Sequence, residues 1–392
     1  MIVKITNTAR DYAWGSHTLI PEYFGVQASG RPMAEVWLGT HPGSPSKLAD
    51  APEHTLIEQL GGRQLPYLLK VLAADMPLSL QAHPNAEQAR IGFARESAAG
   101  IPISSPLRNY KDDRPKPEML VALSDPFEAL CGFAEIGTIL GNFSLLRSVA
   151  GDELRTAISE WSAMLGEPEG LHKLYNLIMR SDHTRLERLT EAATHAASDL
   201  VTRGVDSHPS IDLLIRLQGL YPGDPGVLVS LLMNHVTLRP GEAIALQAGS
   251  IHAYLYGLGV EIMASSDNVL RGGLTPKHID INELEHVLDF RSQKPPVVSA
   301  REVIKGLWEY PADTDEFILY RAELSGSTIL ADLELPTDSI ILVTAGEVAV
   351  SNSLGQREVL KRSEAAFIAA DAKTFTLAGS GTAFIAMSPK TN

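Results

Sequence analysis

The sequence predicts a mainly β protein with an α-helical insertion, arranged as two jelly-roll β-domains plus a helical domain. Short apolar runs punctuated by Gly, Asn and Ser fill residues 338–388, and a similar texture occurs at 227–265. Both are typical of jelly rolls or barrels. From about residue 135 to 220, apolar residues recur at spacings of three and four, which is the period of helices. The 392 residues also exceed one ordinary domain.

Changes in texture set the domain boundaries. The N-terminal part contains apolar runs such as LPYLLKVLAA and EMLVALS, which suit strands joined by loops. Strand-like runs return beyond Pro222, and Pro295-Pro296 marks a linker. The predicted domains are a jelly roll carrying the candidate site (1–132 and 223–292), a helical insertion (133–222) and a C-terminal jelly roll (293–392).

Composition and charge limit the classes of partner. The composition, with 44% hydrophobic and 20% charged residues, predicts a globular protein with a sizeable core. The net charge of -14 disfavours nucleic acid and anionic membranes, which require a basic surface. An anionic small substrate stays possible through a local basic patch. No apolar run approaches the roughly 18 residues of a membrane span, and the start MIVKITNTARDYAWG lacks a signal core, so we expect a cytoplasmic protein.

Several residues are predicted to have structural roles. Cys131 is the single cysteine, which excludes an intramolecular disulfide. Its apolar context, ALCGF, predicts a buried packing residue. Four histidines in or beside the helical block are predicted to be surface or structural residues: His172, His183, His195 and His208.

The segment LSLQAHPN places polar residues in apolar surroundings. In a strand, Ser79, Gln81 and His83 share one face. Burying such a face is costly unless its polar groups find partners. A half-exposed strand explains the same pattern. Glu118, in KPEML, lies where a loop meets an apolar strand, and an isolated glutamate there is often only solvated.

The segment GSIHAYLYG gives a second polar face. His252 and Tyr254 share one side of a strand, and a turn at 257–259 would bring back VEIMA as a hairpin, placing Glu261 near them. A lone histidine in a strand is commonly structural. If Gln81, His83, Glu118 and His252 converged, they would offer two nitrogen and two oxygen ligands. Such a set suits zinc and, less selectively, iron, manganese or cobalt.

The loop ASSDNVLRGGLTPKHID adds positive charge. Arg271 precedes two glycines and Lys277 follows six residues later. Such cations can bind phosphate or stabilise an oxyanion, although an exposed basic loop has the same composition.

Eight ordered segments resemble the type I mannose-6-phosphate isomerases, from residue 3 to about 290. The segments are YAWGS, MAEVWLGTHP, LPYLLKVLAADMPLSLQAHPN, KPE, DPFEALCGF, GSIHAY, GVEIMASSDNVLRGGLTPKHID and HVLDF. The last hundred residues agree only in their β texture. The resemblance implies a cupin-type enzyme with a helical insertion and a second jelly roll. Such an enzyme interconverts D-mannose 6-phosphate and D-fructose 6-phosphate through an enediolate.

The resemblance also implies roles for individual residues. One Zn²⁺ per chain would be held by Gln81, His83, Glu118 and His252. Arg271 takes the position of the catalytic arginine, and the substrate would be a small sugar phosphate. The other matching positions are Lys70, Ser79, Lys116 and Lys277 for substrate or phosphate contacts, and Asp267 and Glu261 as acidic groups near the metal. Tyr254, on the same strand face as His252, is predicted to bind the substrate.

The proton carrier stays open at this point. Asp267, Glu261 and a zinc-bound water are candidates, and Asp267 ranks first because it lies close to Arg271 in sequence. The family usually has Asn-His before Lys-Pro-Glu, whereas this chain has Arg114-Pro115. An imidazole considered for ring opening or proton transfer is therefore absent, and Lys116 or Arg114 would have to adapt.

Two other classes of function remain alternatives. A metal-binding cupin that senses a sugar phosphate would keep the cage but would not need Arg271. An iron-dependent cupin oxygenase would prefer two histidines and one carboxylate over a set that includes Gln81. We expect a monomer, with oligomers left open.

Overall fold

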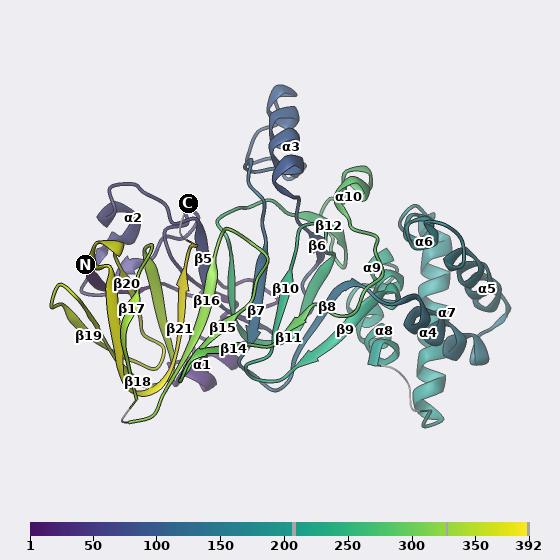
Figure 1. Cartoon of the computed structure of the whole chain (residues 1–392). Coiled ribbons are helices and arrows are strands. Elements are labelled where there is room, and N and C mark those ends of the chain that lie inside the picture. Colours follow the sequence, from purple (N-terminus) through teal and green to yellow (C-terminus); the bar gives the residue numbers. More distant parts are fainter. Residues whose placement is uncertain (206–208, 327, 390–392) are drawn as a thin grey trace.

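The computed structural model describes residues 1–205, 209–326 and 328–389, so that His208 lies outside the described residues. Two antiparallel β-regions lie side by side, and most helices gather beyond the second of them (Figure 1). Helix α3 (Ala86–Ala98) projects from the β-region in the middle. The predicted fold class, mainly β with a helical region, is confirmed. Among the described residues, no helix is long and apolar enough to cross a membrane.

The first sheet contains most strands from the last hundred residues and is completed by the N-terminus. The first strand pairs with a late one, with Ile2 opposite Ile368, so main-chain hydrogen bonds join the N-terminal strand to the C-terminal part of the chain. The strands that the structure describes in this sheet are β1 (Ile2–Thr6), β3 (Lys47–Leu48), β4 (Ala51–Thr55), β14 (Arg301–Ile304), β15 (Leu307–Tyr310), β16 (Ile318–Leu324), β17 (Ile329–Glu334), β18 (Ser339–Asn352), β19 (Arg357–Lys361), β20 (Ala365–Ile368) and β21 (Thr374–Met387).

The second sheet carries the predicted site residues. Its strands come from both sides of the helical block, and a short strand after the predicted linker joins its edge. The domain boundaries given above stay a prediction. The described strands are β2 (Glu35–Leu38), β5 (Tyr67–Ala74), β6 (Leu80–Ala82), β7 (Glu118–Ala122), β8 (Phe127–Phe133), β9 (Met233–Leu238), β10 (Ala243–Leu246), β11 (His252–Ala264), β12 (Leu270–Gly273) and β13 (Val297–Val298).

Strand β11 organises the second sheet, because it pairs with β5, β6, β7 and β8. The hairpin expected at residues 257–259 is wrong: β11 runs continuously from His252 to Ala264, with a register shift between Tyr254 and Tyr256. Next to this register shift, Gly257 has a φ of 118°, a backbone conformation that favours glycine. A Cβ there would lie 2.8 Å from the Phe127 backbone, so a larger residue would clash.

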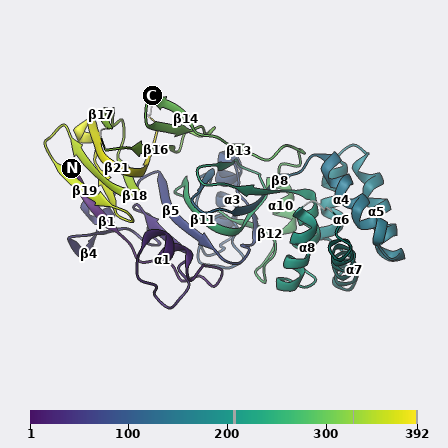
Figure 2. The ribbon, with the colours of Figure 1, turned by 90° about the horizontal axis from the view of Figure 1, so that it is seen from below.

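The helical block packs against one side of the second sheet. Its apolar core is continuous with buried strand residues such as Leu130 and Ala253, and Figure 2 shows helices α4 to α8 beside β8 and β12. In α5, Leu154, Ile158 and Trp161 are buried at helical spacing. The described helices are α1 (Leu19–Phe24), α2 (Leu56–Gln59), α3, α4 (Ile136–Val149), α5 (Asp152–Leu165), α6 (Gly170–Met179), α7 (His183–Thr202), α8 (Pro209–Leu220), α9 (Pro225–Val229), α10 (Ile281–Val287) and the 3₁₀ turns η1 (Ser230–Leu232) and η2 (Ala370–Ala372).

A single carboxylate joins the helical block to the strand that carries Arg271. Asp224 caps α9 by accepting from the Gly226 amide at 2.7 Å, and the same oxygen accepts from the Leu274 amide at 2.8 Å. Its other oxygen accepts from the Thr275 amide at 3.2 Å. The two backbones approach so closely that a Cβ on Gly273 would lie 2.7 Å from the Gly226 Cα. Asp224 therefore fixes the end of β12.

Replacing this carboxylate should destabilise the protein. We expect Asp224→Ala to reduce the free energy of unfolding by about 1–3 kcal/mol, because three backbone donors lose a charged acceptor. Asp224→Asn should lose less, since one acceptor oxygen remains. Thermal unfolding midpoints check this, with Asp152→Ala as the control, because Asp152 is fully exposed at the start of α5. Equal midpoints for the two alanine variants would contradict the assignment.

Candidate functional site

Three predicted ligands meet in the second sheet. His83 follows β6, Glu118 begins β7 and His252 begins β11, and their candidate ligand atoms all lie within 4.8 Å of one another. The Glu118 carboxylate lies between the imidazoles, with 3.3 Å from Oε1 to His83 Nε2 and 3.3 Å from Oε2 to His252 Nε2. All three side chains are buried.

The donor atoms of this cluster fit a metal ion. His83 Nε2, His252 Nε2 and Glu118 Oε2 are buried and make no hydrogen bond with the described residues. Each ring binds a main-chain carbonyl through Nδ1: His83 contacts Asn268 O at 2.7 Å and His252 contacts Ser250 O at 2.9 Å. Nδ1 therefore carries the ring proton, and the Nε2 lone pairs face the carboxylate. Zinc-binding histidines have this arrangement.

Strand register adds Gln81 to the cluster. Gln81 on β6 lies directly opposite His252 on one side and Arg271 of β12 on the other. Its side chain makes no hydrogen bond with the described residues and lines the same cavity as Glu118. The amide oxygen can therefore serve as a fourth ligand.

Local charges favour the forms of these groups that bind a metal. Burial alone would raise the pKa of Glu118, but Lys116, at 3.0 Å from Oε1, and the imidazoles outweigh it and hold this pKa well below its usual range. Burial lowers the pKa of His83 to about 4 in spite of the neighbouring carboxylate. A neutral imidazole and an ionised carboxylate are the forms that coordinate zinc.

A second buried charge cluster lies beside the first. Lys70 on β5 contacts Glu261 Oε2 at 2.9 Å and Glu35 Oε1 at 3.5 Å. The Tyr254 hydroxyl donates to Glu261 at 2.9 Å, as the sequence led us to expect, and Trp37 donates to Glu35 at 2.8 Å. Burial would lower the pKa of Lys70, but the two carboxylates raise it above its usual range, so the lysine stays charged.

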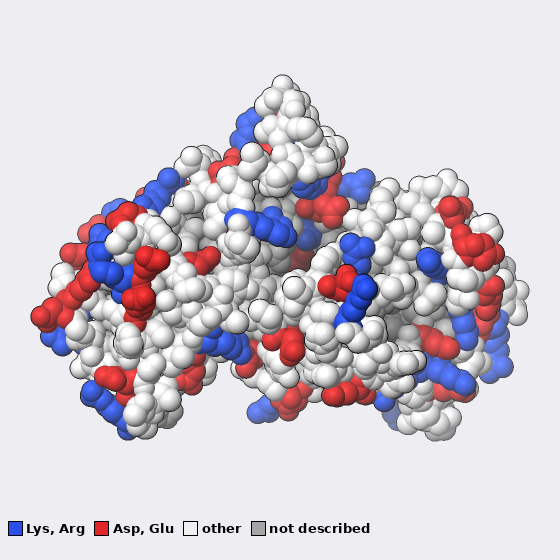
Figure 3. Space-filling model, turned by 180° about the vertical axis from the view of Figure 1, so that it is seen from behind, with Lys and Arg blue, Asp and Glu red and all other residues white. Residues whose placement is uncertain are grey.

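Both clusters open into one cavity of about 840 Å³. Its lining includes Lys116, Tyr254, Glu261, Asp267, Arg271 and Lys277, whereas Ser79 does not contribute to it. The guanidinium of Arg271 and the ammonium of Lys277 have no ion-pair partner among the described residues, and are therefore available to an anion. The surface is hollowed below the projecting α3, with basic side chains near the hollow (Figure 3).

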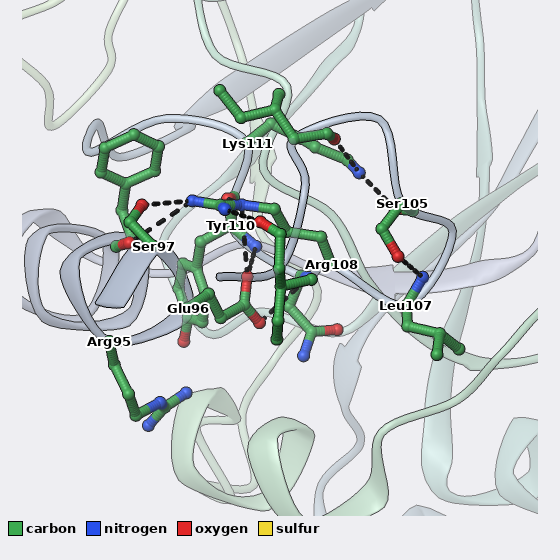
Figure 4. A network of polar contacts seen from close by, with 12 residues as sticks. Arg95, Glu96, Ser97, Ser105, Leu107, Arg108, Tyr110 and Lys111 are labelled. Carbon is green, nitrogen blue, oxygen red and sulfur yellow. Dashed lines mark hydrogen bonds and ion pairs between the residues drawn. The ribbon is translucent and has the colours of Figure 1, made fainter. Parts of the chain in front are cut away.

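The loop after α3 forms one wall of this cavity. Arg108 is buried, forms an ion pair with Glu96, and donates to the Tyr110 and Ile101 carbonyls and to Ser97 Oγ (Figure 4). Lys111 donates to the Ile103 and Ser105 carbonyls at 2.8 Å each. The segment from 101 to 111 is thus tied to α3 and to itself.

Asn268 joins this wall to the candidate metal ligands. Its side chain is fully buried, accepts from the amides of Lys111 and Asp112, and donates to the Asp112 and Arg114 carbonyls. The main-chain carbonyl of Asn268 accepts a hydrogen bond from His83 Nδ1. Asn268, Glu35 and Trp37 were not predicted from the sequence, although the fully polar SSDN segment between apolar strands could have indicated a buried network.

Removing this side chain should weaken zinc binding. We expect Asn268→Ala to lower zinc affinity by about 10- to 100-fold, because the carbonyl that orients His83 loses its support. Competition with a chromogenic chelator measures the affinity. Asn282→Ala, on the exposed face of α10, is the matched control and should bind zinc as the unmodified protein does. An unchanged affinity in Asn268→Ala would refute this role.

Comparisons with known proteins identify the family. The family model for the phosphomannose isomerase type I catalytic domain matches residues 2–136. The mannose-6-phosphate isomerase of Escherichia coli (strain K12) is 36% identical over 396 residues, covering 96% of this chain and 97% of that protein. The mannose-6-phosphate isomerase of Homo sapiens is 31% identical and covers 94% of each chain.

Solved structures similar to this chain belong to the same family as its sequence relatives. The crystal structure of mannose 6-phosphate isomerase from Salmonella typhimurium bound to its substrate, fructose 6-phosphate, and to zinc has a TM-score of 0.88 and 33% identity, covering all of both chains. The apo form from the same organism has a TM-score of 0.87 at 33% identity, covering all of this chain and 99% of that one. By near full-length sequence identity and shared fold, this chain belongs to the type I mannose-6-phosphate isomerase family.

Proposed function

We propose that this chain is a zinc-dependent aldose-ketose isomerase that interconverts D-mannose 6-phosphate and D-fructose 6-phosphate through an enediolate. The observation that carries the proposal is that three buried donor atoms, which make no hydrogen bond with the described residues, converge beside the cavity that Glu118 and Arg271 line, and that Arg271 has no ion-pair partner among those residues. Family membership, together with the zinc and fructose 6-phosphate bound by a structural relative, supports it. Arg271 beside the donor atoms favours turnover over simple sensing.

The metal would be held by Gln81, His83, Glu118 and His252, one ion per chain. When bound, zinc supplies Lewis-acid polarisation of the sugar oxygens. Lys116 holds the Glu118 carboxylate ionised from 3.0 Å and also reaches the cavity, so it acts on both the ligand and the substrate. Lys70, Tyr254 and Lys277 are proposed to contact the sugar phosphate, and Ser79 stays a prediction.

Arg271 is proposed to stabilise the charge that develops on the enediolate oxygen. The guanidinium is permanently protonated and planar, and it has no carboxylate partner among the described residues. It therefore meets the developing oxyanion without first breaking another ion pair.

Asp267 is proposed to carry the proton between C1 and C2. Glu261 is buried and already binds Lys70 and the Tyr254 hydroxyl, so its oxygens are occupied. The Asp267 side chain is 57% exposed and lines the cavity. It can therefore reach a substrate proton without breaking a buried network. Pro115 carries no imidazole that could share this acid-base task.

The remaining proposals concern the binding partner, the cellular compartment and the oligomeric state. Acidic and basic side chains are interspersed on the face in Figure 3, which supports a small sugar phosphate as the partner over nucleic acid or a membrane. We propose a cytoplasmic monomer.

Metal removal and assay test the overall function. Purified protein should contain about one zinc per chain by metal analysis and convert mannose 6-phosphate to fructose 6-phosphate in a coupled assay. A chelator should abolish turnover, and added zinc should restore it. Zinc-loaded protein without turnover would rule out the isomerase function, and iron with an oxygen-dependent reaction would favour an oxygenase.

Two variants test the roles of Arg271 and Asp267. We expect Arg271→Ala to reduce kcat by about 100- to 1,000-fold, because a fixed oxyanion donor is lost. We expect Asp267→Asn to reduce kcat by about 100- to 10,000-fold, because the amide cannot accept the proton. Zinc content should be unchanged in both. The control is Arg291→Ala, because Arg291 is exposed and Asp289 is its one ion-pair partner within the described part of the chain. Near-normal turnover by Asp267→Asn, with Arg271→Ala inactive, would exclude Asp267 as the base.

A further inference from the structure

A buried histidine outside the metal cluster points at the proposed base. His41 lies in the loop after β2 and is only 6% exposed, with its ring edge-on to Trp37 at 4.9 Å between ring centroids. Its Nε2 is 3.4 Å from Asp267 Oδ1. This separation is at the long end of the hydrogen-bonding range, as is common for catalytic contacts before substrate binds.

The loop fixes which nitrogen of His41 carries the proton. The Gly43 amide donates to His41 Nδ1 at 3.1 Å, so Nδ1 is an acceptor and the ring proton is on Nε2, facing Asp267. A Cβ at Gly43 would lie 3.2 Å from Nδ1, so a side chain there would displace the His41 ring by a few tenths of an ångström. Reciprocal hydrogen bonds between Gly39 and Ser46 at 2.9 Å hold the loop.

Asp267 depends on this contact for its orientation. Its backbone amide is fixed by Asp112 at 2.8 Å. Its carboxylate has no other hydrogen-bond or ion-pair partner among the described residues. The charged groups that face it from the surrounding elements are His41 from the loop after β2, Lys70 from β5, Lys111 and Asp112 from the cavity wall, and Lys116 from the residues before β7.

We propose that His41 is a positioning residue for Asp267, whose Nε2–H holds the carboxylate at the cavity edge in the orientation that proton transfer requires. The inference rests on the proposed role of Asp267 in the isomerisation. His41 keeps its own proton throughout: Nδ1 is occupied by the Gly43 amide, so the ring cannot relay a proton from Asp267. The imidazole acts only through the carboxylate.

The same contact affects the acid-base behaviour of the carboxylate. Hydrogen bonding from His41 holds the pKa of Asp267 below its usual range, against the opposing effect of burial. Because the pKa is lowered, losing His41 should raise it. The acidic limb of the pH profile of kcat/KM should then move to higher pH.

A matched pair of variants tests the proposal on the zinc-loaded full chain. Asparagine at position 41 can accept from Gly43 but cannot reach Asp267, whereas glutamine can donate from close to the Nε2 position. We expect His41→Asn to lower kcat by about 10- to 100-fold through misorientation, and to move the acidic limb upward. His41→Gln should recover a large part of kcat and the original limb. Zinc content and circular dichroism should match across the set.

Two further variants test the contact between His41 and Asp267. Gly43→Ala leaves His41 in place but pushes its ring by a few tenths of an ångström, and should cause a smaller change in the same direction, even if His41→Asn does not fold. In an Asp267→Asn background, His41→Asn should cause no further loss.

The outcomes separate this inference from the proposed function. If Asp267→Asn loses turnover while His41→Asn and Gly43→Ala keep the kcat and acidic limb of the unmodified protein, the positioning role is wrong and the isomerase function stands. An additional loss in the Asp267→Asn background would also overturn it. Normal turnover by Asp267→Asn would instead remove the base assignment on which the inference rests.

Discussion

The antiparallel pairing of β11 is the constraint on which the rest of the site depends. One strand, hydrogen-bonded to four others, sets His252 opposite Gln81, Met263 opposite Glu118 and Glu261 opposite Lys70. A slip of one residue would turn each of these side chains to the other face of the sheet. The candidate metal ligands and the buried lysine are therefore placed by the pairings of the same strand, on either side of its register shift between Tyr254 and Tyr256.

Burying so many charges is expensive unless each has a partner. Lys70 lies between two carboxylates, and Lys116 contacts a third, so each of these buried charges has a neighbour of opposite sign, with one negative charge in excess. Three buried polar atoms make no hydrogen bond with the described residues: His83 Nε2, His252 Nε2 and Glu118 Oε2. A cation bound there would relieve this cost, so we expect metal binding to increase the free energy of unfolding.

Much of the architecture could be predicted from residue patterns, because strand texture and helical spacing are local properties. The helical region and the buried Cys131 were predicted correctly. The hairpin after Tyr254 was wrong, since glycines at 257 and 259 indicate a turn as readily as a bend within a strand. The pairing of β1 with β20 joins residues more than three hundred positions apart, and no local pattern carries that information.

The same distinction holds in the site. Four candidate ligands could be named from the sequence because their types are unusual in apolar strands and because ordered segments resemble a family. His41 and Asn268 could not, since each acts through a neighbour far away in sequence. The Asn268 side chain binds the loop at Lys111, and its main chain binds the candidate ligand His83. No pattern in the residues around Asn268 indicates these two contacts.

The helical block leaves the second sheet at β8 and returns at β9, and these strands are hydrogen-bonded neighbours, with Phe133 opposite Met233. The two points of attachment therefore lie side by side, like the ends of a hairpin loop. Closing a longer or shorter segment across such a gap changes the chain entropy only slowly with length. The length of the block is thus weakly constrained by chain entropy, and its size is limited instead by the apolar core that it shares with the second sheet.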